Sequence, residues 1–441
     1  MKLVNIHKQY FVLILAVFIF QNGQAQQWSL QQCIDTANSN NKNLQIAQNN
    51  IESASIKVKE AKSNLMPKLS ANADYKYFTN LPYQLMPLST FVPTAPEGEF
   101  KEAQFGVPHN INANLQLAIP LYNPQIYGGI EASKLATEVA QLKHEKSQEQ
   151  IYFEIANLYY NAQIIQSQIA FIDSNLVNTN RLLSNLNLLK EQSLATGTDV
   201  EKVKLQRSQL TTQKQTLESK LGQVLRALKF TIGIPIDQNF EIEYNFNFKE
   251  ETNYDVQSSI DSKLIQTQNK LLNIELNTLS KSRYLPTVNF VGSYGTTGFG
   301  YDKQPNSFLK FYPIGFAGIQ LNYPIFNGTT TLRKMDQKQI EITNNKLQLD
   351  LINDQNEMQI ANAKAQRLVT YSNIETTQQQ IYLAKNIYNN TVLQQKQGLA
   401  SLTDILLADN ALREAQQANI SAIIEYLKAD LELKKLTGNI K

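Results

Sequence analysis

The chain of 441 residues has 42% hydrophobic residues, a mean hydropathy of −0.34 and a formal charge of +3. A protein with several membrane-spanning helices is excluded, because it would need several apolar runs of about 20 residues. A nucleic-acid partner has no support either, because phosphate binding needs a concentrated basic face and the charges here nearly balance.

The first 25 residues have the three parts of a secretory signal peptide. Two lysines flank the start of the chain, and residues 11–20 form an apolar stretch. Gly23 and Ala25 then stand at positions −3 and −1 of an expected cleavage before Gln26. The alternative is a retained anchor, although the apolar stretch is too short to span a bilayer. We expect an exported protein with a cleaved signal peptide at residues 1–25.

No residue pattern points to an enzyme, a cofactor or a metal site. His7, His109 and His144 are scattered, and no HExxH, phosphate-loop, CxxC or Ser-His-Asp pattern is present. The single cysteine, Cys33, cannot form an intramolecular disulfide, and its apolar neighbours predict a buried structural thiol. We therefore expect no catalytic residues, no cofactor and no bound metal.

The first half of the chain begins with helix and then changes to strand. Two helical pieces are expected within residues 28–65, with Ser29 as the N-cap. From Lys68 apolar and polar residues alternate, which indicates a strand with one face of each kind, and residues 111–119 repeat the pattern. The proline-rich residues 81–109 between them are expected to lack regular structure.

A very long polar helix follows, from about residue 124 to residue 192. Within this range no proline follows Pro124. At a rise of 1.5 Å per residue, the helix would be about 100 Å long. A turn near residues 195–197 follows, and we expect Thr198 and Glu201 to form the capping box of the next helix. The apolar positions alternate by four and three like a coiled-coil seam: Ile151, Ile155, Leu158, Ala162, Ile165, Ile169, Ile172, Leu176, Leu183 and Leu186.

The second half repeats the first, because prolines, turns and element lengths recur in the same order. Its expected loop at residues 298–310 is shorter than its counterpart at 81–109. The predicted organisation is a signal peptide at 1–25, a first repeat at 26–235 (helix, β-hairpin at about 68–122, long helix at about 124–192, helix at about 199–230), a connector at 236–257 and a second repeat at 258–441 (helix, β-hairpin at about 287–324, long helix at about 329–396, helix at about 403–437).

The four expected strands leave two readings open. A sheet with one polar and one apolar face suits the surface of a soluble domain. Strands of about ten residues with aromatic ends also suit a membrane β-barrel. A barrel in lipid must close, and about eight strands is the smallest size. Two copies of the chain would supply eight strands and three copies would supply twelve.

Several motifs, in their order and their doubling, resemble the TolC-type outer-membrane efflux family (the outer-membrane factors) over essentially the whole mature chain. They are Trp28–Ile34, Leu65–Ser70, Ile119–Pro124 and the two turns at 193–199 and 398–404. The resemblance implies a mainly α fold with a small β portion. Long antiparallel helical hairpins and four amphipathic strands per chain would contribute to a homotrimer with one 12-strand barrel and one 12-helix periplasmic tunnel.

The same resemblance implies a passive exit duct of a tripartite efflux or type I secretion system. Its partners would be two further copies of the chain, a periplasmic adaptor, an inner-membrane pump and outer-membrane lipid. It would lie in the outer membrane of a Gram-negative cell and extend into the periplasm. The alternative is a soluble periplasmic coiled-coil adaptor or scaffold, which would not need two proline-flanked amphipathic hairpins. The sequence does not specify the cargo.

The resemblance also implies that the two helix turns form periplasmic tips where an adaptor docks. Alternatively, their small residues only permit a tight helical hairpin. The expected docking residues are Leu194, Ala195, Thr196 and Gly197 in the first turn and Gly398, Leu399, Ala400 and Ser401 in the second.

Asp199 and Asp404 match the family's gating aspartates in the first turn of the helix after each tip. Three chains would bring three copies of each near one axis, where a ring of carboxylates attracts cations. The alternative is that the helix dipole favours an aspartate at a helix start without any other purpose. A second acidic ring is in doubt, because Leu407 takes its place and Asp409 is offset.

Four prolines are expected at the crossings between helix and strand, since proline fixes φ and continues neither ladder. Two aromatic residues beside them, Tyr122 and Phe326, are expected to form a belt at the inner edge of the lipid, with core packing as the alternative. The junction prolines are Pro67, Pro120, Pro286 and Pro324.

Overall fold

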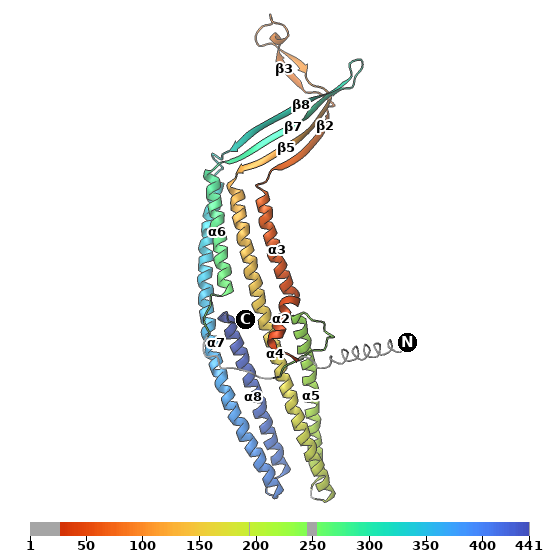
Figure 1. Cartoon of the computed structure of the whole chain (residues 1–441), viewed down its shortest axis with the longest axis vertical. Helices are drawn as coiled ribbons and strands as arrows, with labels where there is room; N and C mark the ends of the chain where they lie inside the picture. The colour runs from red at the N-terminus through yellow and green to blue at the C-terminus, as the bar shows by residue number, and fades with distance from the viewer. Residues whose placement is uncertain (1–26, 194, 245–253, 441) are drawn as a thin grey trace, which may run out of the picture. The chain divides into compact units, whose positions relative to one another are not determined.

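The computed structural model describes residues 27–193, 195–244 and 254–440 (Figure 1). The expected signal peptide, Leu194 and part of the expected connector lie outside the described residues. The described chain forms two compact units. One unit draws on the described residues within 27–51, 140–265 and 348–440 and is built mainly of helices, and the other draws on 52–139 and 266–347 and carries the main sheet. Each unit therefore contains residues from both halves of the sequence.

The main sheet has four antiparallel strands in the order β2-β5-β7-β8 (Figure 1). Its strands are β2 (Lys68–Tyr77), β5 (His109–Tyr122), β7 (Thr287–Tyr301) and β8 (Phe308–Asn322). Strands β5 and β7 pair with each other, so the sheet joins one hairpin from each half of the chain. Strands β2 and β8 are the two edges, and each keeps one side without a strand partner in the described chain.

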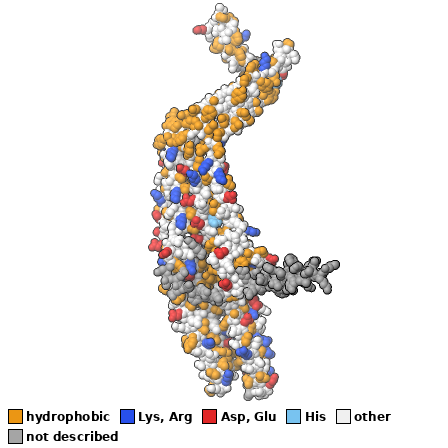
Figure 2. Space-filling view, in the orientation of Figure 1, with side chains coloured by type: hydrophobic (Ala, Val, Ile, Leu, Met, Phe, Trp, Pro, Cys, Tyr) orange, Lys and Arg blue, Asp and Glu red, His pale blue; other side chains and the backbone are white. Residues whose placement is uncertain are grey.

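The predicted alternation divides the sheet into an apolar and a polar face. On the apolar face Leu69 lies opposite Leu117, and Figure 2 shows hydrophobic side chains gathered over the strands. On the polar face the Asn72 amide donates to Gln116 Oε1 at 3.1 Å. Further polar residues of that face are Ser70, Asp74, Lys76, Asn110, Asn112, Asn114, Asn289 and Ser293. The sheet therefore presents one face suited to lipid and one suited to water.

The expectation that residues 81–109 lack regular structure is wrong. Strands β3 (Tyr83–Pro87) and β4 (Phe100–Gln104) form an antiparallel hairpin, followed on the β3 side by a short 3-10 turn at Leu88–Thr90. The prolines do not prevent pairing because Pro82 precedes β3 and Pro87 is its last residue, so no interior ladder amide is lost.

The expected loop at 298–310 is also shorter in the structure, because β7 and β8 extend until only residues 302–307 connect them. Glycines in β7 make room for large side chains of β8 there. A Cβ on Gly298 would lie 2.6 Å from a ring carbon of Phe311. Gly298 and Gly300 are therefore strand residues that provide space across a strand pair, and the expectation that they lie in the loop is wrong.

The helices begin and end within a few residues of the expected bounds. The two long ones, α4 and α7, have 68 and 67 residues, and both contribute to both compact units. No helix within the described ranges is long and apolar enough to cross a membrane. The helices are α2 (Leu30–Asn40), α3 (Lys42–Ser63), α4 (Pro124–Glu191), α5 (Gly197–Ile232), α6 (Ile260–Tyr284), α7 (Thr330–Lys396) and α8 (Leu402–Leu436).

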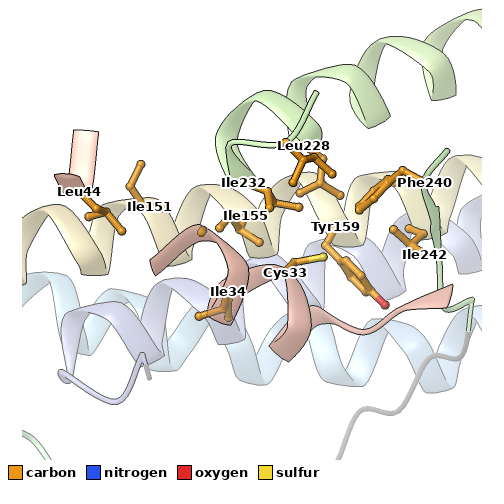
Figure 3. Packing of buried hydrophobic residues seen from close by; sticks show 13 residues of the cluster. Cys33, Ile34, Leu44, Ile151, Ile155, Tyr159, Leu228, Ile232, Phe240 and Ile242 are labelled. Carbon is orange, nitrogen blue, oxygen red and sulfur yellow. The ribbon is translucent and has the colours of Figure 1, made fainter. Parts of the chain in front are cut away.

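The main hydrophobic core of the helical unit surrounds the predicted seam of α4 (Figure 3). Cys33, Ile155 and Ile232 are fully buried in it, on α2, α4 and α5. The burial of Cys33 agrees with the predicted buried thiol, and it raises the pKa of that thiol to about 12. A short parallel pair, β1 (Gln27–Trp28) with β6 (Glu241–Ile242), closes this core. The seam residues that are buried are Ile151, Ile155, Ala162, Ile169, Ile172, Leu183 and Leu186.

Candidate functional sites at the helix turns and strand junctions

The first helix turn is built on a capping box that begins two residues earlier than predicted. Helix α4 ends at Glu191, Ser193 adopts a left-handed backbone with φ of 59°, and Thr196 is the N-cap of α5. The Thr196 hydroxyl donates to Asp199 Oδ2 at 2.6 Å and accepts from the Asp199 amide at 3.2 Å. The predicted box of Thr198 with Glu201 is therefore wrong. The extended backbone of Thr196 aims its hydroxyl at the third helical amide.

The second turn repeats this construction. Gly398 reverses the chain with φ of 76°, and Ser401 is the N-cap of α8. The Ser401 amide donates to Asp404 Oδ2 at 2.8 Å, and its hydroxyl donates to the same oxygen at 2.6 Å. Leu399, at the end of this turn, exposes 76% of its surface. The two turns thus share one geometry, with an exposed apolar side chain at the second.

Both candidate gate residues are helix-capping carboxylates. Hydrogen bonds from Thr196, first from its hydroxyl and then from its amide, hold the pKa of Asp199 below its ordinary value. Ser401 lowers the pKa of Asp404 in the same way. Both side chains are at the surface, so each turn carries a full negative charge at neutral pH. The capping function is visible in the structure, and the gate function stays a prediction.

The offset acid, Asp409, does not point to solvent as a second ring would require. Its carboxylate lies 2.6 Å from Arg413, one turn further along α8. It also accepts from the Gln206 amide of α5 at 2.9 Å. Asp409 therefore links the helices that follow the two turns. The spacing of Asp409 and Arg413 in the sequence could have indicated the ion pair, because residues four apart face each other on a helix.

The junction prolines occupy two kinds of position. Pro67, Pro286 and Pro324 each lie in the short segment between a helix and a strand, as predicted. Pro120 differs, because it lies inside β5, where the register with β7 shifts before Tyr122. The prediction that Pro120 marks a crossing is therefore wrong, because the strand continues past it to Tyr122 with an irregularity in the pairing.

The two aromatic-belt candidates lie at equivalent ends of the sheet strands. Tyr122 is the last residue of β5, and its ring is 6.0 Å from that of Tyr127 in α4. Phe326 follows β8 and exposes 81% of its surface, and Ile325 beside it is also exposed. Core packing within the chain therefore does not account for Phe326, and its exposure is compatible with an interfacial belt.

Known proteins share these features over nearly the whole chain. Residues 277–439 match the model of the outer membrane efflux protein family. The outer membrane protein TolC of Salmonella enteritidis is 19% identical over 431 residues, which cover 94% of this chain and 83% of that protein. These similarities are distant in sequence.

Several solved structures have a fold similar to that of this chain, although their sequence identities to it are low. The outer membrane protein VceC of Vibrio cholerae superposes with a TM-score of 0.73 at 16% identity, covering 93% of this chain and 97% of that chain. The CmeC outer membrane channel of Campylobacter jejuni gives 0.71 at 15%, covering 93% and 85%. The MtrE outer membrane channel of Neisseria gonorrhoeae gives 0.68 at 17%, covering 93% and 89%.

The chain repeats the order helix, β-hairpin and long helix, and its sheet has one polar and one apolar face. Together with these similarities, this arrangement defines an efflux channel of the Gram-negative outer membrane. Residues 277–439 place the C-terminal part of the chain in the outer membrane efflux protein family, and the chain as a whole is TolC-like. It is a non-enzymatic transporter, and the alternative of a soluble adaptor or scaffold is set aside. Membership implies a trimeric channel working in an efflux system.

Proposed function

We propose that three copies of the chain close one 12-strand barrel and act as a passive exit duct for tripartite efflux or type I secretion. The observation that carries this proposal is the sheet with two open edges and an apolar outer face. In lipid an unpaired strand edge is too costly to persist, so β2 and β8 need partners. A second and a third copy supply them, with β8 of one chain pairing with β2 of the next.

The polar face of the sheet would then line the water-filled passage. Asn112 donates to Asp74 Oδ2 at 3.2 Å across β2 and β5, so polar side chains of this face pair with one another across the strands. The long helices α4 and α7, each on the order of 100 Å, would continue the passage through the periplasm. Transport through such a duct needs no covalent step.

We further propose that a periplasmic adaptor, bound in turn to an inner-membrane pump, docks at the two helix turns. Small residues at Ala195, Gly197 and Ala400 would let a partner helix approach the backbone closely. The exposed Leu399 would give that partner an apolar anchor. A docking role for Leu194 stays a prediction outside the described residues.

Cell fractionation tests the exit-duct proposal. The protein should stay in the outer-membrane fraction after a high-salt wash and migrate as a heavy trimer on a gel without heating. Release into the wash as a monomer would refute the shared barrel. Deleting the gene for the inner-membrane pump should abolish export of the cargo without changing assembly of the duct.

The gate proposal needs variants that separate charge from capping. Replacing Asp199 and Asp404 with Asn removes both charges, while each amide oxygen can still accept from the N-cap amide. Replacing Ser401 with Ala keeps the charge and weakens the cap, at about 1 kcal/mol. In planar bilayers the double Asn variant should lose cation preference and cation block, whereas Ser401→Ala should retain both. Equal selectivity of the double Asn variant and the wild type would sink the gate proposal.

A further inference from the structure

One strand of the sheet does not keep the division into a polar and an apolar face. In the middle of β8 three consecutive residues of the polar face are aromatic or aliphatic: Tyr312 lies opposite Thr297, Ile314 opposite Gly295 and Phe316 opposite Ser293. With Phe299 of β7 they form one surface on the polar face, which we call the β8 patch. Its four side chains are 37–61% exposed, and the rings of Phe299 and Tyr312 are 6.2 Å apart.

Lipid cannot account for the β8 patch. The apolar face of β8, with Leu309, Phe311 and Ile319, already meets the lipid if the sheet belongs to a barrel. The β8 patch lies on the opposite face, toward water in the passage. A cluster of exposed aromatic and aliphatic side chains in that position normally marks an interaction surface.

The β3–β4 hairpin carries an uncovered surface of matching character. The register places Tyr83, Leu85 and Phe100 on one face of the hairpin, and each exposes 61–68% of its surface. Glu102, opposite Leu85, lies on the same face. Lys310, opposite Phe299, lies beside the β8 patch. The two surfaces therefore match in apolar character and can pair one acid with one base.

The topology gives the hairpin a shorter path to the β8 of a neighbouring copy than to its own. The hairpin begins at Tyr83, six residues after β2 ends at Tyr77, a reach of up to about 20 Å. Within one chain β2 is three strands from β8, about 14 Å away at the usual spacing, with the polar faces of β5 and β7 between. In the proposed barrel the neighbour's β2 is directly beside β8, about 5 Å away.

The register within one chain relates the level of the β8 patch to the end of β2. Tyr77 at the end of β2 is paired level with His109, which is level with Gly300 and through it with Leu309 of β8. The β8 patch thus begins near the level at which the hairpin leaves the sheet. A hairpin folded inward from the neighbour would meet it without crossing another strand.

We propose that the β3–β4 hairpin of one protomer packs on the β8 patch of the adjacent protomer and narrows the outer mouth of the channel. Three such contacts would surround the opening. The proposal rests on the trimeric duct proposed above. It assigns residues 81–109 a role as an intersubunit cover.

Cysteine crosslinking in the full-length protein tests this contact. Cys33 is first replaced with Ala, because it is the only cysteine of the chain. Leu85→Cys combined with Ile314→Cys should then convert most of the monomer band into covalent dimer and trimer on denaturing gels after mild oxidation. The matched control combines Leu85→Cys with Ile319→Cys, since Ile319 lies in the same strand on the lipid face, and it should remain monomeric.

Three results would overturn the proposal: no crosslink in a trimer that still assembles, a crosslink only within one chain, or equal crosslinking of the control pair. Trimer formation on unheated gels is scored on the same samples, so failure of the proposed assembly is seen separately as loss of the trimer. A second readout avoids cysteine chemistry. Leu85→Ser with Phe100→Ser should raise single-channel conductance if the hairpin narrows the mouth, and unchanged conductance would count against it.

Discussion

Two adjacent glycines in α4 allow a sharp test of the packing next to the sheet. A Cβ on Gly128 would lie 2.0 Å from Oγ1 and 2.8 Å from Cβ of Thr278 in α6, whereas a Cβ on Gly129 would meet nothing within 4 Å. Because Cβ of Thr278 is itself too close, rotating its side chain cannot relieve the clash. Gly128→Ala must therefore push α4 and α6 apart, and Gly129→Ala needs no adjustment.

The magnitude follows from two opposing effects. Replacing glycine with alanine inside a helix stabilises by about 1 kcal/mol, and this gain is the same at both positions. Forcing a methyl group into a closed contact costs about 1–3 kcal/mol. Gly129→Ala should therefore be more stable than the wild type. Its stability should be higher than that of Gly128→Ala by about 1–3 kcal/mol per chain.

Heat dissociation of the purified trimer measures this order. The temperature at which half of the trimer band is lost should be highest for Gly129→Ala and lowest for Gly128→Ala. Combining Gly128→Ala with Thr278→Gly removes every clashing atom and should recover part of the loss. If Gly128→Ala is as stable as Gly129→Ala, the close approach of α4 and α6 is wrong.

Three further outcomes are expected. Gly295→Ala should greatly reduce trimer yield, because its Cβ would lie 2.2 Å from a backbone oxygen of β5, while Gly318→Ala, with open space around it, should assemble normally; equal yields would contradict the β5–β7 pairing. Arg367→Met should lower the melting temperature, because it removes the main partner of Asp430, which is 14% exposed and lies 2.6 Å from Arg367. Breaking such a pair costs about 3–5 kcal/mol when it is fully buried. An unchanged melting curve would show that the pair is unimportant. The folded pKa of Asp404 lies below its ordinary 3.8, so its charge and its contribution to the cap are fully present above that pH and are lost as pH falls through the folded value; cation preference should thus be the same at pH 7 and pH 5, and loss between them would contradict this origin.

Much of the fold followed from local patterns. The lengths of α4 and α7 follow from the absence of proline and glycine over many turns, and the β2 and β5 pattern follows from strict alternation. These signals depend only on near neighbours along the chain, so they are visible in the sequence. The doubled motifs then allowed a resemblance to a family, which the comparisons confirmed.

Other features depend on partners far apart in the chain. The order β2-β5-β7-β8, the pairing of Asp409 with Gln206 and the β3–β4 hairpin need hydrogen bonds between separated segments. Several hydroxyl residues near each turn could have served as the N-cap. The backbone angles at Thr196 and Ser401 make these two residues the caps, and those angles are not visible in the sequence.

The sequence by itself determined the two long helices, the strands with one polar and one apolar face, and the resemblance to the family. Only the tertiary structure decided which strands are edges and which faces their residues share. Alternation is a property of one strand, but the face it serves depends on the register with the next strand. The register with β7 places Tyr312 and Ile314 on the polar face of the sheet. From periodicity alone, these apolar residues would have been assigned to the apolar face.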